Sequence, residues 1–100
     1  MLQILNLAEK HALPLLADEV YYGMAYDSST KFIPFAHAGA DLPDTPKVPI
    51  LSVWALSKVY CVPGWRIGWL IFHDQHNYFE HIHAKALKVC QIWLHPQTPL

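Results

Sequence analysis

The sequence predicts an α/β fold, and composition and periodicity are the two observations that lead to this prediction. Hydrophobic residues make up 53% of the 100 residues and charged residues 15%, which is typical of a chain that folds around one core. A helical pattern at the start of the chain runs directly into a short apolar segment. A helix that leads into a buried strand is typical of α/β layers.

Residues 2–12 are predicted to form a helix, because apolar residues recur there at intervals of three and four, and Pro14 ends it. The next residues, 13–17, are almost continuously apolar, which predicts a strand buried on both faces. In open α/β sheets, ligands bind at the C-terminal ends of such strands. Four residues at that end are therefore candidates for function: Asp18, Glu19, Tyr21 and Tyr22.

The middle of the chain is predicted to be a loop followed by two strands. Residues 27–49 are rich in proline, serine and other turn-forming residues and show neither helical nor strand periodicity, so we expect a surface loop there. Residues 50–54 and 67–72 are short, β-favouring apolar runs and predict strands. The loop that joins these two strands contains Lys58.

The last predicted element is an amphipathic helix over residues 78–94, with Pro96 and Pro99 after it. Four histidines near its start could bind a transition metal through their imidazole rings: His73, His76, His81 and His83. They lack the compact ligand motif of a zinc protease. A polar, solvated helix face is therefore the favoured interpretation, and no metal site is predicted.

Composition also argues against several classes of function. The net charge is -1, and Arg66 is the single arginine among seven cationic residues, so the chain has no basic cluster for nucleic acid. No apolar run reaches the roughly 20 residues that a bilayer requires, and the first residues do not resemble a signal peptide. Cys61 and Cys90 predict neither a disulfide scaffold nor a zinc site, so a reducing, cytoplasmic location is the default expectation.

Three segments resemble the cofactor-binding segments of fold-type I, pyridoxal-phosphate-dependent aminotransferases of class I/II. They are Ala-Asp-Glu-Val-Tyr at 17–21, Ser-Lys at 57–58 and Pro-Gly-Trp-Arg-Ile-Gly-Trp at 63–69. Within that family, residues 48–52 and 62–69 look most like the enzymes that act on tyrosine. The resemblance extends over nearly the whole chain. It implies pyridoxal 5'-phosphate as the cofactor and part of a mostly parallel-sheet large domain as the fold.

Lys58 is the candidate catalytic residue. Pyridoxal phosphate needs an amine to form a Schiff base with its aldehyde, and a partly desolvated lysine between buried strands is expected to supply one with a lowered pKa. The resemblance implies that Lys58 holds the cofactor in this way. It also implies that Lys58 then moves a proton at the substrate Cα as general base and acid.

The candidate cofactor-binding residues lie on both sides of Lys58 in the sequence. The resemblance implies that Asp18 keeps the pyridine nitrogen protonated and that Tyr21 donates a hydrogen bond to the ring oxygen. Arg66 would bind the phosphate through two parallel hydrogen bonds, which a lysine cannot reproduce. Many relatives bind the phosphate with a serine three residues before the lysine, where this chain has Ala55. Ser57 is the candidate substitute.

Residues 1–100 are expected to be a fragment of such a large domain, without the upstream part and the small C-terminal domain of the family. The resemblance implies transfer of an amino group from an aromatic amino acid such as tyrosine to a 2-oxo acid such as 2-oxoglutarate, and a homodimer for the full-length protein. Two alternatives stay open. One is a non-transaminating relative, such as a carbon–sulfur lyase or an enzyme like aminocyclopropane-carboxylate synthase. The other is a truncated, inactive product that serves as an interaction module.

Overall fold

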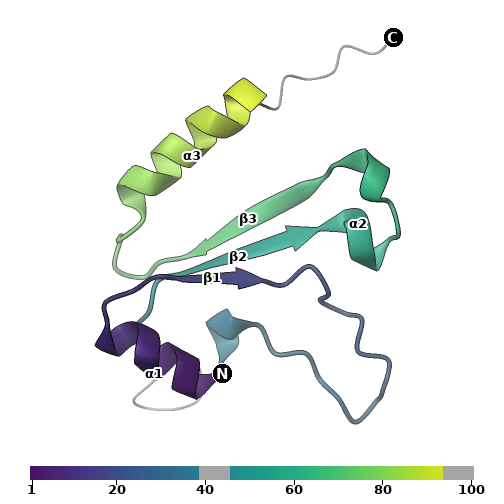
Figure 1. Cartoon of the computed structure of the whole chain (residues 1–100), viewed down its shortest axis with the longest axis horizontal. Coiled ribbons are helices and arrows are strands. Elements are labelled where there is room, and N and C mark those ends of the chain that lie inside the picture. The colour runs from purple at the N-terminus through teal and green to yellow at the C-terminus, as the bar shows by residue number, and fades with distance from the viewer. Residues whose placement is uncertain (39–45, 94–100) are drawn as a thin grey trace.

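The chain folds as an α/β unit in a computed structural model that describes residues 1–38 and 46–93 (Figure 1). The elements, in chain order, are α1 (Leu2–Lys10), β1 (Leu15–Asp18), the 3-10 turn η1 (Phe35–His37), β2 (Ile50–Ala55), α2 (Leu56–Val59), the 3-10 turn η2 (Pro63–Trp65), β3 (Gly68–His73) and α3 (Glu80–Trp93). The α/β prediction is confirmed, and every predicted helix and strand is present with slightly different ends. Pro96, Pro99 and the side chain of Cys90 lie outside the described residues.

α1 ends before Pro14, because backbone hydrogen bonds at its C-terminus terminate the helix. Ala12 adopts a left-handed conformation with a φ of 49°. The amides of Ala12 and Leu13 donate hydrogen bonds of 3.0 and 2.9 Å to the carbonyl oxygens of Glu9 and Ala8. This pair of bonds is a Schellman motif, which satisfies the last helical carbonyls and turns the chain into β1.

The three strands form one sheet in the order β1-β2-β3. β1 and β2 are parallel, with Leu15 opposite Ile50 and Asp18 opposite Val53. β2 and β3 are antiparallel, with Ala55 opposite Gly68, so the sheet is mixed. The reversal follows from residues 56–67, where α2 and η2 turn the chain back beside β2 without a crossover to the other end of the sheet.

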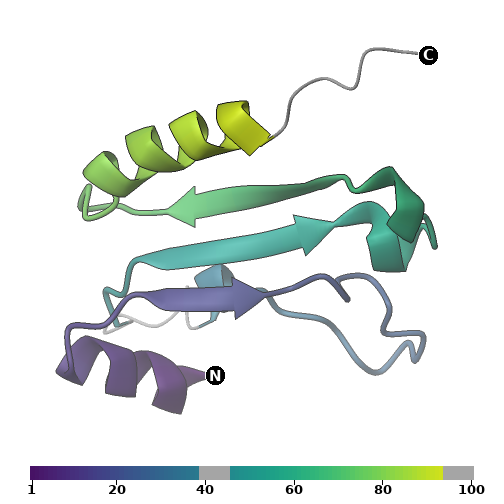
Figure 2. The same cartoon turned by 45° about the horizontal axis from the view of Figure 1, so that its top comes forward.

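The two faces of the sheet are covered by different elements. Figures 1 and 2 show α1 and α3 on opposite sides of the sheet, and Figure 1 shows η1 on the same side as α1. The core on the first side is formed by Leu5, Ala17, Ala38 and Ile50. On the second side, the ring of Phe72 in β3 lies 4.8 Å from the ring of His83 in α3.

β1 is not buried on both faces, so this prediction was wrong. Ala17 is buried in the core, but its neighbour Leu16 is 65% exposed. Neighbouring residues of a strand point to opposite faces, so Leu16 points away from the α1 side. No described element covers Leu16, and the continuous apolar run therefore did not indicate burial here.

None of the helices within residues 1–38 and 46–93 has the length and hydropathy needed to cross a bilayer.

Candidate functional site

The candidate site residues gather at the edge of the sheet that is formed by the C-terminal ends of β1 and β2 and the start of β3. β1 and β2 are parallel, so Asp18 at the end of β1 and α2 after the end of β2 lie at the same edge. β3 runs in the opposite direction, so its first residues and Arg66 before them also lie there. Figure 1 shows the end of β1, the α2 turn and the start of β3 at this edge. The topology thus places segments that are distant in sequence along one border.

Lys58 lies in the short helix α2 and not in a loop, which differs from the sequence prediction. Its side chain is exposed rather than partly desolvated. The Nζ atom lies 5.7 Å from the centroid of the Tyr21 ring, within the range of a cation–π contact. Two of the predicted site residues, one after β1 and one after β2, are therefore brought into direct proximity.

Asp18 and Tyr21 are both exposed at the end of β1. Asp18 Oδ1 accepts a 3.4 Å hydrogen bond from the amide of Val20. The Tyr21 carbonyl accepts a 3.1 Å hydrogen bond from the amide of Met24, so the chain turns directly after the strand. Asp18 and Tyr21 thus present a carboxylate and a phenol to solvent at the end of β1.

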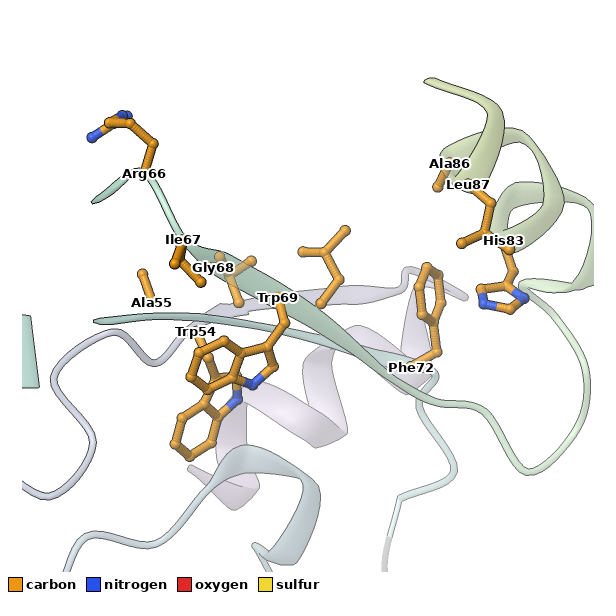
Figure 3. Close-up of a pocket in the computed structure, with 12 residues that line it drawn as sticks. Trp54, Ala55, Arg66, Ile67, Gly68, Trp69, Phe72, His83, Ala86 and Leu87 are labelled. Atoms are coloured by element: carbon orange, nitrogen blue, oxygen red, sulfur yellow. The ribbon is translucent and has the colours of Figure 1, made fainter. Parts of the chain in front are cut away.

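Arg66 follows η2 in a left-handed conformation, with a φ of 53° and a ψ of 34°. Its Nη1 donates a 3.2 Å hydrogen bond to the carbonyl of Pro63. Figure 3 shows the Arg66 side chain reaching away from the sheet. An uncommon backbone conformation for a non-glycine residue often marks a functional position, because the surrounding structure must sustain its cost.

The two residues considered for the phosphate contact near Lys58 have different positions. Ala55 is the last residue of β2 and the N-cap of α2. A serine there would cap the helix with its hydroxyl, and alanine supplies no such oxygen. Ser57 lies within α2 and is half-buried.

Sequence reasoning missed the role of Glu19, which was noted only for its position. Glu19 is 4% exposed, and its Oε1 accepts a 2.8 Å hydrogen bond from the amide of Phe35. The available signal was the two-residue period of the strand. Glu19 shares a face with Ala17 and therefore points to the core, while Asp18 points to the other face.

An apolar groove of about 440 Å³ lies between the sheet and α3 (Figure 3). Its lining includes Trp54, Trp69, Phe72, His83 and Leu87. The Trp54 and Trp69 rings are stacked with their centroids 6.5 Å apart. Arg66 also lines this groove, whereas Lys58, Asp18 and Tyr21 do not, so the groove meets the candidate site only at Arg66.

Asp74, which directly follows His73 in the sequence, has a structural role at the start of α3. Both carboxylate oxygens of Asp74 accept hydrogen bonds that order the start of α3, at 2.9 Å from the Tyr78 amide and 2.6 Å from the Phe79 amide. Among residues 1–38 and the described part of 46–93, no group of three or more histidine, cysteine or acidic side chains is arranged to hold a metal ion.

The arrangement of these helices and strands is that of part of a fold-type I aminotransferase, as comparison with a solved structure shows. The solved structure of an alanine aminotransferase from Pyrococcus furiosus superposes with a TM-score of 0.79 and 32% identity, covering 97% of this chain and 23% of that one. A profile of the family described as aminotransferase class I and II matches residues 1–94. The chain belongs to this family.

Sequence relatives point in the same direction. Tyrosine aminotransferase of Dictyostelium discoideum is 36% identical over 98% of this chain and 22% of its own length. Tyrosine aminotransferase of Bos taurus is 40% identical over 96% of this chain and 20% of its own length. The human enzyme is 39% identical over the same shares. The chain therefore spans about a fifth of the length of these relatives.

Proposed function

We propose that this chain is the pyridoxal-phosphate-binding segment of an aminotransferase, and that residues 1–100 form part of its large domain. The amino group would pass from an aromatic amino acid such as tyrosine to a 2-oxo acid such as 2-oxoglutarate. The observation that carries the proposal is the approach of Lys58 Nζ to the Tyr21 ring, at 5.7 Å, along the edge that also bears Asp18. The names of the relatives and the general dependence of the family on this cofactor support it.

The donor set fits the cofactor. Pyridoxal phosphate carries an aldehyde, a pyridine nitrogen, a ring oxygen and a phosphate, and the edge offers an amine, a carboxylate, a phenol and a guanidinium. When bound, the cofactor would supply an electron sink for charge at the substrate Cα. Every other part of the reaction would depend on the side chains of the protein.

Each side chain has a defined task in the proposal. Lys58 would hold the cofactor and, once released by the substrate amine, move a proton at the substrate Cα. Asp18 would keep the pyridine nitrogen protonated, and Tyr21 would donate to the ring oxygen. Arg66 would bind the phosphate with its planar guanidinium. We assign Ser57 as a further phosphate contact.

The assembly and location of the whole protein are also part of the proposal. We expect a homodimer for the full-length protein, by analogy with the family. We expect the cytosol as its compartment, because a chain with two cysteines does not have the composition of a disulfide scaffold.

Borohydride trapping tests the cofactor assignment. The protein produced by its native gene is incubated with pyridoxal phosphate, reduced with borohydride, digested and analysed by mass spectrometry. The pyridoxyl group is expected on Lys58, while exposed Lys47 and Lys85 serve as internal controls for nonspecific reaction. Equal labelling of the three lysines contradicts the assignment.

The same preparation distinguishes the alternatives. Turnover that requires a 2-oxo acid supports transamination, and turnover of an amino acid without one indicates a lyase-type relative. Intact mass comes first, because a gene product close to 11.5 kDa would support an inactive interaction module. A substantially larger product would support the reading of this chain as one segment of a working enzyme.

A further inference from the structure

Glu19 is a buried carboxylate that lies between two residues of the proposed cofactor site. It follows Asp18 and precedes Tyr21 by two positions. Only 4% of its surface is exposed, and its Oε1 accepts the amide hydrogen of Phe35 at 2.8 Å. Phe35 is the first residue of η1, so one side chain ties the end of β1 to a segment sixteen residues further along the chain.

The backbone of Glu19 makes two more connections. Its amide donates a 3.0 Å hydrogen bond to the carbonyl of Val53 in β2, and its own carbonyl accepts a 3.0 Å bond from the amide of Tyr22. A single residue therefore links β1 to β2, to the turn that carries Tyr21, and to η1. All three hydrogen bonds are made at the residue that directly follows β1.

The second carboxylate oxygen of Glu19 is buried, and two further polar side chains on the same face of the sheet are buried too. The parallel register continues by one residue beyond Asp18 and Val53, which places Glu19 opposite Trp54. Glu19 Oε2, Ser52 Oγ and Trp54 Nε1 are buried without a hydrogen-bond partner among the described residues. All three residues belong to the same face of the sheet.

Burial of a carboxylate is costly, so packing alone does not account for Glu19. An apolar residue of similar size would fill the same space without the cost of desolvating a charge. The hydrogen bond to Phe35 is directional and fixes a position, which an apolar contact does not. The structure therefore favours a role in alignment.

We propose that Glu19 is a positioning residue for the cofactor site. By holding the end of β1 against η1 and β2, it keeps Asp18 and Tyr21 in place beside Lys58. The inference rests on the proposed function, because it concerns the alignment of the same site. Glu19 itself points to the core and would not touch the cofactor.

Three variants of the native gene product test this role. Glu19→Ala removes the bond to Phe35, and Glu19→Gln retains an acceptor oxygen at the same place. Glu9→Ala is the matched control, since Glu9 Oε1 accepts a 2.8 Å bond from the Lys47 amide near the opposite end of β1. If Glu19→Ala does not fold, Glu19→Asp, which is one methylene shorter, takes its place.

The first readout is the pH midpoint of the visible absorption of bound pyridoxal phosphate. A displaced Tyr21 would stabilise the deprotonated form of the lysine-bound cofactor less well. Glu19→Ala is therefore expected to raise the pH midpoint by about half a pH unit. Glu19→Gln and Glu9→Ala are expected to keep the wild-type midpoint. A residue that only stabilises the fold would lower the melting temperature and leave the midpoint unchanged, and that result would overturn the proposal.

The second readout is amide hydrogen exchange without cofactor. Glu19→Ala is expected to accelerate exchange about fivefold at residues 19 and 22, whose amides hold the strand end, while Glu9→Ala leaves them unchanged. Unchanged exchange in Glu19→Ala contradicts the positioning role. If the wild-type protein binds no cofactor, the proposed function fails, and exchange alone then decides whether Glu19 aligns the strand end.

Discussion

Arg66 combines two demands at one residue. Its backbone has a φ of 53°, which is uncommon for a residue other than glycine, asparagine or aspartate. Its guanidinium donates to the Pro63 carbonyl at 3.2 Å, so the side chain helps to close the η2 turn that its own backbone ends. Replacement by an uncharged residue therefore removes both the hydrogen bond to the Pro63 carbonyl and the positive charge.

Asp27 gives a pH-dependent prediction at the residue scale. The Ser29 hydroxyl donates a 2.6 Å hydrogen bond to Oδ2, the Ser29 amide donates a 3.0 Å bond to Oδ1, and both lower the pKa of Asp27. Because the folded-state pKa lies below the unfolded one, the turn is stabilised above the usual aspartate pKa. That stabilisation is lost as the pH falls through the lowered value.

The expected result is a rise in the pKa of Asp27 toward its usual range in Ser29→Ala. Thr30→Val is the control, because it removes a longer bond of 3.5 Å and should raise the pKa less. The measurement is a titration of the labelled aspartate carboxyl carbon by NMR. A larger effect of Thr30→Val would show that the hydroxyl of Ser29 is not the main cause.

The candidate residues of the site could be named from the sequence, but their exposure and their contacts could not be predicted. Lys58, Asp18 and Arg66 were predicted from the resemblance to a cofactor-binding family, and the structure places the segments that carry them at the same edge of the sheet. The exposure of Lys58 could not be read from its neighbours, since α2 has only four residues and shows no periodicity. Glu19 was not assigned a role, because the two-residue period places it on the face of Ala17 but does not show which face of the strand α1 covers.

At the scale of elements, Gly68 determines how closely β2 and β3 approach. A Cβ atom at this position would lie 2.8 Å from the carbonyl oxygen of Trp54 in β2, and a backbone atom cannot yield without moving the strand. Gly68→Ala is therefore expected to lower the free energy of unfolding by about 1–3 kcal/mol. Denaturant unfolding of the native gene product measures this change.

Gly64 supplies the matched control for this substitution. A Cβ atom there meets nothing within 4 Å, so Gly64→Ala should change the free energy of unfolding by less than about 0.5 kcal/mol. Similar losses in the two variants would show that the close approach of the strands at Gly68 is not the cause of the effect.

The existence of the elements followed from periodicity, but the direction of β3 did not. Residues 67–72 have the same apolar pattern whichever way the strand runs, so the antiparallel pairing with β2 was not predictable from it. The end of α1 was also displaced from the prediction. The left-handed Ala12 closes the helix before Pro14, and an alanine gives no warning of that conformation.

At the scale of the whole molecule, the chain is flat. Its principal extents are 53 × 40 × 18 Å and its radius of gyration is 16.1 Å, whereas a compact domain of this length has about 13 Å. Large apolar side chains from several elements are exposed, among them Leu7, Leu16, Leu70 and Leu87. Exposed surface of this kind on both sides of a sheet is typical of a unit that packs against further protein.

The recombinant 100-residue chain is therefore expected to be poorly soluble or molten. Its small core does not fix the packing of the sheet, so we expect retained far-UV circular dichroism, a weak near-UV signal and binding of a hydrophobic dye. The full native gene product serves as the comparison. A sharp thermal transition with dispersed amide resonances for the isolated chain would contradict this expectation.

The two strand pairings differ in the length of chain that must close before they form. Residues 56–67 connect β2 to β3, while residues 19–49 separate β1 from β2. A shorter connection loses less entropy on closure and its contacts form sooner. During folding we therefore expect β2, α2 and β3 to assemble first, which brings the segments that carry Lys58 and Arg66 to the same edge of the sheet. β1 would then add Asp18 and Tyr21, so the site would be completed in two stages.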